Sequence, residues 1–401
     1  MGQGREGRRH RGGLSGQTDM QSIDFGARVA ALAARLAREN VAAYVGTRQA
    51  VLHYLCGTFM PWRGAVVVTA DGDAAVVYWA MDSERVIAEG CALPVETFTG
   101  SGLVEAISTR LAAHGAERGT VGLDLAHPGA AQIAPGMLTA GEHLDLAARL
   151  PAARLVNGVR WIDDLMLIKS PAEIERLRRA GAVADHGFRA GVAAIAAGVT
   201  ENHVAGVVEA AIRDHGSTWA WSVTGGTEVG AGERTCFLRG VTQQSTDRPI
   251  GRDEFVVIDL HPMIDLYLSD LSVPVFFGTP NAAQERAIAA WEDVVATMLA
   301  GLKPGRAVRD CAADGVAAFA RSGLGEFGLP LFGHGLGTCA RTRPFMNAGS
   351  DDVLAPGMVI ALGTHLYQPG VAGMRLEYPV LIGERGAEPL VETPAVVHRR
   401  A

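Results

Sequence analysis

The feature that most constrains the fold is an order of elements that occurs twice in the second half of the chain. In each copy, two stretches with helix caps or helical spacing precede two apolar stretches typical of strands. The first copy has helices beginning at Ser170-Pro171 and spanning 200–214, then strands at 255–260 and 267–277. The second copy has helices at 282–300 and 308–321, then strands at 359–366 and 373–382. Two helices and a hairpin, found twice, predict two similar halves packed around one central site.

A different pattern precedes this repeat. Apolar residues follow helical spacing from Phe25 onward, and apolar stretches at 65–69 and 74–79 flank an Asp-Gly step that is typical of a hairpin. The chain has 401 residues, more than the roughly 100–200 of one domain. We therefore predict a disordered tail at 1–20, an α/β domain at 21–160 and a second domain at 161–401.

The composition excludes several functional classes. Lys and Arg number 36 against 43 Asp and Glu, so no basic surface indicates a nucleic-acid partner. The apolar runs are shorter than the roughly 20 residues of a membrane span, which predicts no membrane partner. The five cysteines are scattered and include no CxxC pair, which argues against a disulfide framework or a zinc knuckle. We therefore expect a cytoplasmic protein.

Two further features are expected to carry no chemistry. Residues 1–17 are rich in glycine and arginine, but no apolar segment follows Arg8-Arg9 as it would in a twin-arginine signal. The chain has two lysines, Lys169 and Lys303, and both stand near helix boundaries that give no sign of a buried amine. A Schiff-base mechanism is therefore not expected.

Two aspartates are the first candidates for chemistry. Asp270 follows Asp259 by 11 residues, and a two-residue turn at Ile264-Asp265 would place the two carboxylates opposite each other across a hairpin. Like charges so placed are destabilising unless a cation lies between them or one carboxyl keeps its proton. The alternative is a pair of exposed aspartates at a sheet edge. The apolar run that leads into Asp259 favours the functional interpretation.

Two more polar residues lie in the second copy of the repeat. His334 stands between Gly333 and Gly335, which would allow close backbone approach to a ligand and leave the imidazole unobstructed. Glu377 lies in an otherwise apolar strand, with Arg375 two residues earlier on the same face as a possible charge partner. A lone histidine is more often structural than catalytic, so each of these signals is modest by itself.

Together these residues resemble a known superfamily. The order Asp259, Asp270, Gly-His-Gly-x-Gly around His334, Pro-Gly-Met, and Arg-x-Glu ending at Glu377 resembles the pita-bread superfamily of methionine aminopeptidase, aminopeptidase P, prolidase and creatinase. The segments at 169–173 and 54–57 are also similar to that family, and the resemblance covers about residues 25–395. It implies an α/β (α+β) protein, in which a creatinase/prolidase-like N-terminal domain precedes a pita-bread catalytic domain with an internal pseudo-twofold repeat. It also implies a homodimer.

The resemblance implies a metal site with a missing ligand. In the metallopeptidases of this family two divalent ions are held by Asp, Asp, His, Glu and Glu. Here Gly363 stands at the first Glu position, and His365 lies two residues further along the same strand face, displaced by about 6.5 Å. We therefore predict one divalent ion per chain (manganese, iron, cobalt or zinc) or none, with the candidate ligands Asp259, Asp270, His334 and Glu377.

Two catalytic histidines of the peptidases also have no counterpart. Arg341 stands seven residues after His334, where the family has a histidine, and 224–251 contains no histidine, with Arg239 as a second candidate replacement. Arginine does not act as a base near neutral pH, but it binds carboxylates through two parallel hydrogen bonds. We therefore expect a small anionic substrate. The candidate catalytic residues are His334, Arg341, His365 and Arg375.

Three functions remain open from the sequence. The first is an Xaa-Pro peptidase- or creatinase-like hydrolase that cleaves a C–N bond of a small, carboxylate-bearing molecule or short peptide. The second is a non-hydrolytic or metal-independent enzyme on the same fold, either a lyase or a creatinase-like enzyme. The third is a binding protein with an inactive site, although buried carboxylates without a cation would cost several kcal/mol.

Overall fold

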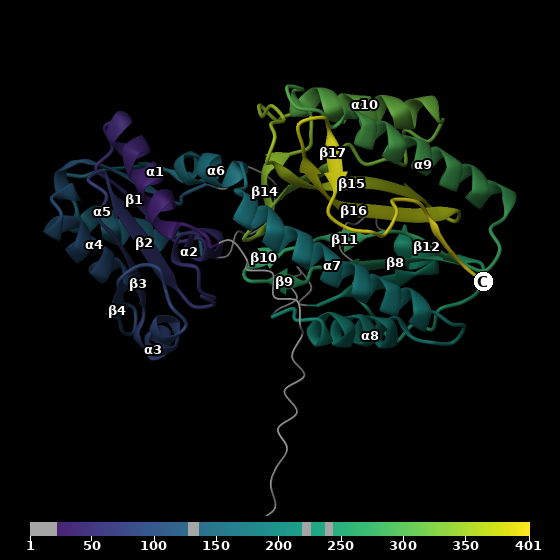
Figure 1. The fold of residues 1–401 in the computed structure, drawn as a ribbon, viewed down its shortest axis with the longest axis horizontal. Coiled ribbons are helices and arrows are strands. Elements are labelled where there is room, and N and C mark those ends of the chain that lie inside the picture. The colour runs from purple at the N-terminus through teal and green to yellow at the C-terminus, as the bar shows by residue number, and fades with distance from the viewer. Residues whose placement is uncertain (1–21, 127–135, 219–225, 237–243) are drawn as a thin grey trace, which may run out of the picture.

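The structure is a computed structural model that describes residues 22–126, 136–218, 226–236 and 244–401. The predicted tail and Arg239 lie outside the described residues. The described chain forms two units side by side, with the first copy and the second copy of the repeat both in the larger unit (Figure 1).

The first unit is a six-stranded mixed sheet with helices on both faces (Figure 1). Its strand order is β4-β3-β2-β1-β5-β6. Alternate valines of one strand point to opposite faces, so Val66 and Val68 join the core beneath α1, whereas Val67 joins the core beneath α4. The elements are α1 (Phe25–Arg38), β1 (Ala43–Gly46), α2 (Gln49–Cys56), β2 (Gly64–Thr69), β3 (Ala74–Trp79), α3 (Ala80–Ala88), β4 (Val95–Phe98), α4 (Leu103–Ala113), a 3₁₀ turn (Ala116–Arg118), β5 (Thr120–Leu123), α5 (Ala140–Arg149), β6 (Arg154–Asn157) and α6 (Val159–Leu167). The predicted first helix and the predicted hairpin are confirmed.

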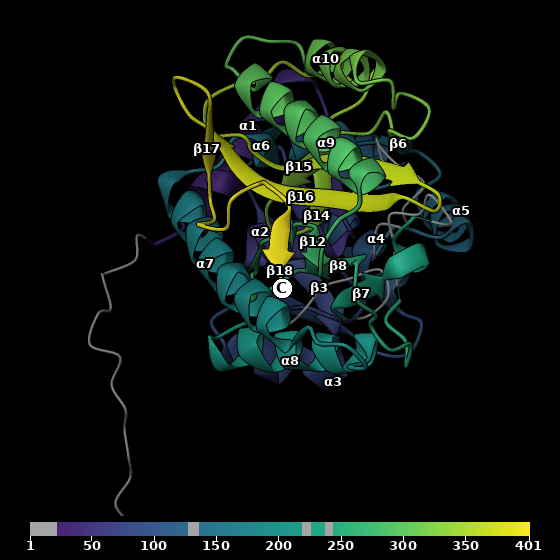
Figure 2. The same ribbon diagram turned by 90° about the vertical axis from the view of Figure 1, so that its right-hand side faces the viewer.

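The second unit is built on one large sheet, whose main path is β14-β13-β15-β16-β11-β8-β12-β18, with β7 paired to β8 and β17 to β16. In Figure 2, α9 and α10 lie above this sheet and α7 and α8 below it. The elements are α7 (Pro171–Ala194), α8 (Glu201–Asp214), β7 (Glu228–Ala231), a 3₁₀ turn (Gly232–Thr235), β8 (Glu254–Leu260), β9 (Met263–Ile264), β10 (Tyr267–Leu268), β11 (Leu271–Ser272), β12 (Val275–Phe277), α9 (Ala282–Gly301), α10 (Val308–Arg321), β13 (Gly333–Leu336), β14 (Ala340–Phe345), β15 (Val359–Gln368), β16 (Ala372–Ile382), β17 (Ala387–Pro389) and β18 (His398–Arg400). The duplicated order of helices and strands is confirmed.

Local capping explains where these helices begin. Ser170 accepts a hydrogen bond from the backbone N–H of Glu173, whose carboxylate accepts from the backbone of Ser170 in return. Asn281 makes the same reciprocal pair with Gln284 at the start of α9. Each of these caps satisfies backbone donors that the first turn of a helix leaves unpaired.

The strand predicted at 267–277 is wrong in detail. It is divided into β10, β11 and β12, because Ser269-Asp270 and Val273-Pro274 interrupt it. The turn is at Asp265-Leu266, both with positive φ (46° and 72°), and not at Ile264-Asp265. Asp259 consequently lies opposite Ser272 and not opposite Asp270. The error amounts to two residues, so each side chain keeps its predicted face of the sheet.

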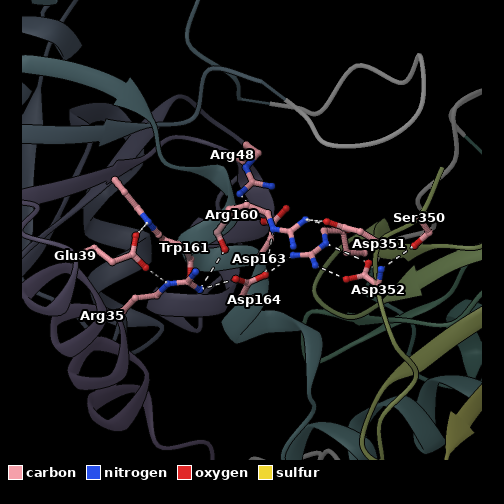
Figure 3. A network of polar contacts seen from close by, with 11 residues as sticks. Arg35, Glu39, Arg48, Arg160, Trp161, Asp163, Asp164, Ser350, Asp351 and Asp352 are labelled. Atoms are coloured by element: carbon pink, nitrogen blue, oxygen red, sulfur yellow. Dashed lines mark hydrogen bonds and ion pairs between the residues drawn. The ribbon is translucent and has the colours of Figure 1, made fainter. Parts of the chain in front are cut away.

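Arginines and carboxylates join the two units. Asp164 on α6 lies 2.7 Å from Arg35 of α1, and it also receives a hydrogen bond from Arg343 of β14. Arg343 in turn binds Asp352 through two of its nitrogens. Figure 3 shows this row of alternating charges from Arg35 to Asp352. The boundary predicted between residues 160 and 161 falls inside α6, which packs on α1.

A second junction lies at the start of α7. Arg28 of α1 lies 3.0 Å from Glu173 and donates to the hydroxyl of Tyr267, and all three side chains are buried. Lys169 is also buried here, 5% exposed, with its amine 3.3 Å from the carbonyl oxygen of Leu167. Burial lowers the pKa of Lys169 to about 8. The expectation that neither lysine is a buried amine is therefore wrong, because the domain junction covers this one.

Candidate metal centre

The two aspartates come from one short segment of the sheet. Asp259 stands near the end of β8 with 0% exposure, opposite Ser272 on β11 and Glu228 on β7. Asp270 lies between β10 and β11 and is 2% exposed. Apolar residues on the other face of β8 anchor this strand in the core, so the carboxylate is carried into the interior by its strand. Both aspartates are buried, and the edge-aspartate alternative is therefore wrong.

His261 joins these aspartates, and sequence analysis missed it. Its Nε2 lies 3.1 Å from Oδ1 of Asp270 and 3.8 Å from Oδ1 of Asp259. The residue is 6% exposed. A signal was available, because His261 follows Asp259 by two residues and side chains two apart share one face of a strand.

His334 and Glu377 approach the same aspartate from the opposite side. Nε2 of His334 lies 3.5 Å from Oδ2 of Asp270, and one ligand atom each from Asp270, His334 and Glu377 lie within 4.8 Å of one another. Glu377 is opposite Ser272 in the register of β16 and β11. The structure thus brings together all four residues that were predicted as ligands.

The glycines beside His334 have a different role from the predicted one. A Cβ on Gly333 would lie 1.9 Å from the carbonyl oxygen of Ala361, and one on Gly335 would lie 2.0 Å from that of Arg343. They are therefore required by the close approach of neighbouring strands. The ring of His334 is held by the backbone, since Nδ1 lies 3.2 Å from the carbonyl oxygen of Gly335 and 3.1 Å from the N–H of Arg341. This directs Nε2 toward Asp270.

His365 occupies the space that a side chain at position 363 would need. Gly363 pairs with Glu377 in the register of β15 and β16, so a glutamate there would face Glu377 directly. A Cβ on Gly363 would instead lie 2.9 Å from Cε1 of His365. Nε2 of His365 lies 3.3 Å from Oε1 of Glu377. The imidazole of His365 therefore contacts the candidate ligand Glu377, and it does so from the space that a side chain at position 363 would occupy.

Arg375 binds carboxylates inside the site. Its guanidinium lies 2.6 Å from Oδ2 of Asp259, 3.2 Å from Oε2 of Glu228 and 3.9 Å from Oε1 of Glu377. Arg375 and Glu228 are each 2% exposed. Glu228 was not predicted, since its strand reaches Asp259 through pairing that leaves no local sequence signal.

Burial and charge separate the pKa values of these groups. Burial raises the pKa of Asp259 to about 7, although Arg375 and His261 oppose this rise. Burial acts in the same direction on Asp270, but His261 outweighs it, and the pKa of Asp270 lies below its usual range. Burial lowers the pKa of His261, yet the charges of Asp270 and Asp259 win and raise it to about 9. The aspartate pair therefore differs in proton affinity despite sharing one pocket.

The opposite side of the site follows the same rules. Burial lowers the pKa of His334 and outweighs the attraction of Asp270 and Glu377. Burial and the charge of Asp270 raise the pKa of Glu377, but the hydrogen bond and charge of His365 together with His334 lower it overall. Glu377 is thus favoured as a carboxylate, the form that binds a cation.

The remaining predicted residue lies at the edge of this cluster. Arg341 is half-buried at the start of β14, with φ of 59°, and its backbone contacts His334. Its charge helps to lower the pKa of Asp270.

The donor set fits a divalent ion. Oδ1 of Asp259, Oε2 of Glu377 and Nε2 of His334 are buried and have no hydrogen-bond partner among the described residues, whereas Oδ2 of Asp259 is ion-paired with Arg375. Buried acceptors without partners are costly, and a cation relieves that cost. Two overlapping groups of three ligand atoms are close enough to hold an ion, Asp259–His261–Asp270 and Asp270–His334–Glu377.

Comparison with known proteins agrees with this geometry. The family description "Metallopeptidase family M24" matches residues 175–384, and "Creatinase/Prolidase N-terminal domain" matches residues 28–165. The chain belongs to metallopeptidase family M24. The predicted pita-bread resemblance is confirmed, and with it membership of a family of hydrolases.

Several relatives in this family are Xaa-Pro dipeptidases. The chain is 31% identical to the "Xaa-Pro dipeptidase" of Lactobacillus helveticus over 241 residues, which cover 60% of this chain and 64% of the relative. It is 27% identical to the "Xaa-Pro dipeptidase" of Pyrococcus furiosus over 342 residues, covering 85% and 91%. The match thus spans less than two thirds of the Lactobacillus protein and most of the Pyrococcus one.

Solved M24 structures share the fold. The prolidase from Pyrococcus horikoshii OT3 superimposes with a TM-score of 0.80 at 23% identity, covering 92% of this chain and 99% of that one. The Xaa-Pro dipeptidase from Bacillus anthracis gives a TM-score of 0.80 at 20% identity, covering 94% and 100%. The predicted two-domain α/β architecture is confirmed. In the described part of the chain, no helix has the length and apolar character to cross a membrane.

Proposed function

We propose that this M24 protein hydrolyses a C–N bond in a small, carboxylate-bearing substrate and uses one divalent ion held by Asp259, Asp270 and Glu377. The observation that carries the proposal is the convergence of three buried carboxylates with unpaired oxygens at one point of the sheet. The names of the relatives support a dipeptide of the Xaa-Pro type as the first substrate class to test.

The ion and the side chains have separate tasks. A divalent ion in such a site polarises a carbonyl oxygen and lowers the pKa of water. Glu377 is held toward the ion by His365, which lies 3.3 Å from it. His334, directed at Asp270 by two backbone contacts, is either a ligand or a group that moves a proton. Arg375 holds Asp259 in place through their 2.6 Å ion pair and opposes the burial-driven rise of its pKa.

Arg341 supplies the substrate preference in this proposal. It is half-buried beside His334, and a guanidinium binds a carboxylate with two parallel hydrogen bonds. Arg341→Gln is expected to lower kcat/KM about 10- to 100-fold, mainly through KM, for a dipeptide with a free C-terminal carboxylate. The same variant should leave the C-terminal amide of that dipeptide unaffected. The exposed Arg309→Gln is the control, and equal losses on both substrates would contradict the assignment.

The test of the function combines elemental analysis with a substrate screen. The full-length chain, purified without chelators, is expected to contain about one transition-metal ion and to release free amino acid from Xaa-Pro dipeptides. Chelation should abolish that release, and restoring the ion should recover it. An ion-free protein, or an ion-loaded one inactive on every dipeptide and on creatine-like C–N substrates, would contradict the proposal.

One observation favours a second candidate, a metal-independent enzyme. Each candidate carboxylate ligand already has a basic neighbour, since Arg375 contacts Asp259, His261 contacts Asp270, and His365 contacts Glu377. The guanidinium of Arg375 and the imidazole of His261, whose pKa is raised to about 9, would partly balance the charge without an ion. Full activity in the presence of a strong chelator would select this candidate over the first.

A further inference from the structure

The aspartate side of the site contains one more potential ligand than the predicted set. Nε2 of His261 lies 3.1 Å from Oδ1 of Asp270 and 3.8 Å from Oδ1 of Asp259, and one ligand atom from each of the three residues lies within 4.8 Å of the others. Metal–ligand bonds of about 2.1 Å place neighbouring ligand atoms roughly 3.0 to 3.4 Å apart. The three atoms therefore need little movement to surround an ion.

The three residues of this group are buried, which distinguishes them from an exposed cluster of acidic side chains. Asp259, His261 and Asp270 are 0%, 6% and 2% exposed. Oδ1 of Asp259 has no hydrogen-bond partner among the described residues, and Oδ1 of Asp270 is paired with the imidazole of His261 at 3.1 Å. An unpartnered oxygen buried this deeply beside an imidazole and a second carboxylate indicates that a ligand belongs between them.

The opposite side of the site has lost a donor. Gly363 offers no side chain, and the His365 ring over it is directed at Glu377. Compared with the Asp, Asp, His, Glu and Glu ligands that the family resemblance implies, this chain therefore has one additional nitrogen donor beside Asp259. It has one oxygen donor fewer beside His334. This asymmetry favours the aspartate side as the place where an ion is held.

We propose that His261 is a direct ligand of the divalent ion and joins Asp259 and Asp270 of the ligand set given above. This proposal rests on the metal-dependent function given above and specifies which residues bind the ion. Imidazole suits zinc, cobalt, iron and nickel, whereas manganese prefers oxygen donors. The site consequently favours a zinc-class ion, and we expect Zn²⁺ or Co²⁺ to bind more tightly than Mn²⁺ relative to an all-oxygen site.

Cobalt is the probe for the test, because its spectrum reports its ligands. Full-length protein is freed of metal, loaded with Co²⁺, and compared with His261→Gln, Asp259→Asn and the exposed control His203→Gln. We expect about 100-fold weaker Co²⁺ affinity in His261→Gln, measured by competition with a chromophoric chelator, and no change in His203→Gln. One hyperfine-shifted imidazole N–H proton resonance should also disappear in His261→Gln.

A gain-of-signal variant covers the case in which His261→Gln does not fold. In His261→Cys, a side chain that coordinates Co²⁺ adds an intense sulfur-to-cobalt charge-transfer band in the near ultraviolet, above the wild-type background from the five native cysteines. Appearance of that band supports the proposal, and its absence in folded, cobalt-loaded protein overturns it.

The outcomes separate this proposal from the function on which it rests. Wild-type protein that binds no Co²⁺ overturns both. Wild-type binding that is lost in Asp259→Asn but kept within about threefold in His261→Gln, with the same imidazole resonances, overturns the role of His261 alone. In that case His261 is an ion-pair partner of Asp270.

Discussion

Two regions of this protein bury clusters of acids and bases, and they do so differently. At the domain junction, Asp164 lies between two arginines and Asp352 receives two hydrogen bonds from Arg343. In the metal centre, Asp259 and Glu377 retain oxygens without hydrogen-bond partners among the described residues. Paired charges hold two domains in place, whereas incompletely paired ones provide ligands. The two regions are therefore distinguished by their unsatisfied acceptors and not by burial.

The largest expected effect comes from neutralising one acceptor in the metal centre. Asp259→Asn should remove the bound ion and lower kcat/KM about 10,000-fold, since a tenfold loss corresponds to about 1.4 kcal/mol and a catalytic ion contributes several. The measurements are metal content and hydrolysis of an Xaa-Pro dipeptide. Asp351→Asn, an exposed aspartate at the junction, is the matched control. If Asp259→Asn retained the ion at full stoichiometry, the difference proposed between the metal centre and the domain junction would be contradicted.

The junction should respond in stability and not in metal content. Arg343→Met leaves the buried Asp352 and the half-buried Asp164 without their shared partner, at a cost of about 4 kcal/mol. For a protein of 401 residues we expect Tm to fall by roughly 5 °C. Arg160→Met, which removes the pairs of an exposed arginine with Asp351 and Asp164, should cost less than about 1 kcal/mol. Loss of metal in Arg343→Met would mean that the two regions are not independent.

The pH dependence of stability should differ with and without the ion. The pKa of Asp259 is raised to about 7 and that of His261 to about 9, so the folded, metal-free protein holds protons that the unfolded chain has released. The stability contributed by these two groups in the metal-free protein should therefore fall as the pH rises from about 4 to 9. A bound ion replaces those protons and removes the loss.

Thermal unfolding measures this difference directly. The increase in Tm on adding Zn²⁺ should be roughly 4 °C larger at pH 8 than at pH 5, equivalent to about 3 kcal/mol. Asp259→Asn is the control, because this variant lacks the titrating carboxyl of Asp259, one of the two groups that hold a proton. It is also expected to lose the bound ion. An identical increase at both pH values would contradict the assigned protonation.

The smallest expected effect concerns Lys169, a charge at the junction that is buried at 5% exposure. Its pKa is lowered to about 8, so at pH 7 the amine is charged and its burial costs stability. Stability should rise with pH between about 8 and 10.5, where only the unfolded chain holds this proton. Lys169→Met should therefore stabilise the protein by about 2 kcal/mol at pH 7, measured by urea unfolding. If Lys169→Met were less stable than the wild type, the amine of Lys169 would be fully paired in the folded protein, as the neighbouring arginines are.

The sequence predicted the parts of the fold that depend on local signals. Ser170 caps its helix through its own side chain, and β8, β15 and β16 are largely apolar runs of 7, 10 and 11 residues. The register around Asp259 was predicted with an error of two residues, because the turn has Asp265 and Leu266 at positive φ and neither is the glycine or asparagine that normally indicates one.

The candidate site was predictable where the residues form a pattern along the chain. Asp259, Asp270, His334 and Glu377 were found because their spacing resembles a family. His261 was missed because it departs from that pattern, although its two-residue spacing from Asp259 places it on the same face. Glu228 was missed because strand pairing alone brings it to Arg375, 147 residues away along the chain.

The contact between His365 and Gly363 has a consequence for how this sequence descends and diverges. A Cβ at position 363 would lie 2.9 Å from Cε1 of the ring, so any side chain there requires the imidazole to move. A single mutation that returns glutamate to position 363 therefore encounters the ring of His365. The two positions are coupled, and we expect the return of a glutamate to be tolerated better when His365 is replaced as well.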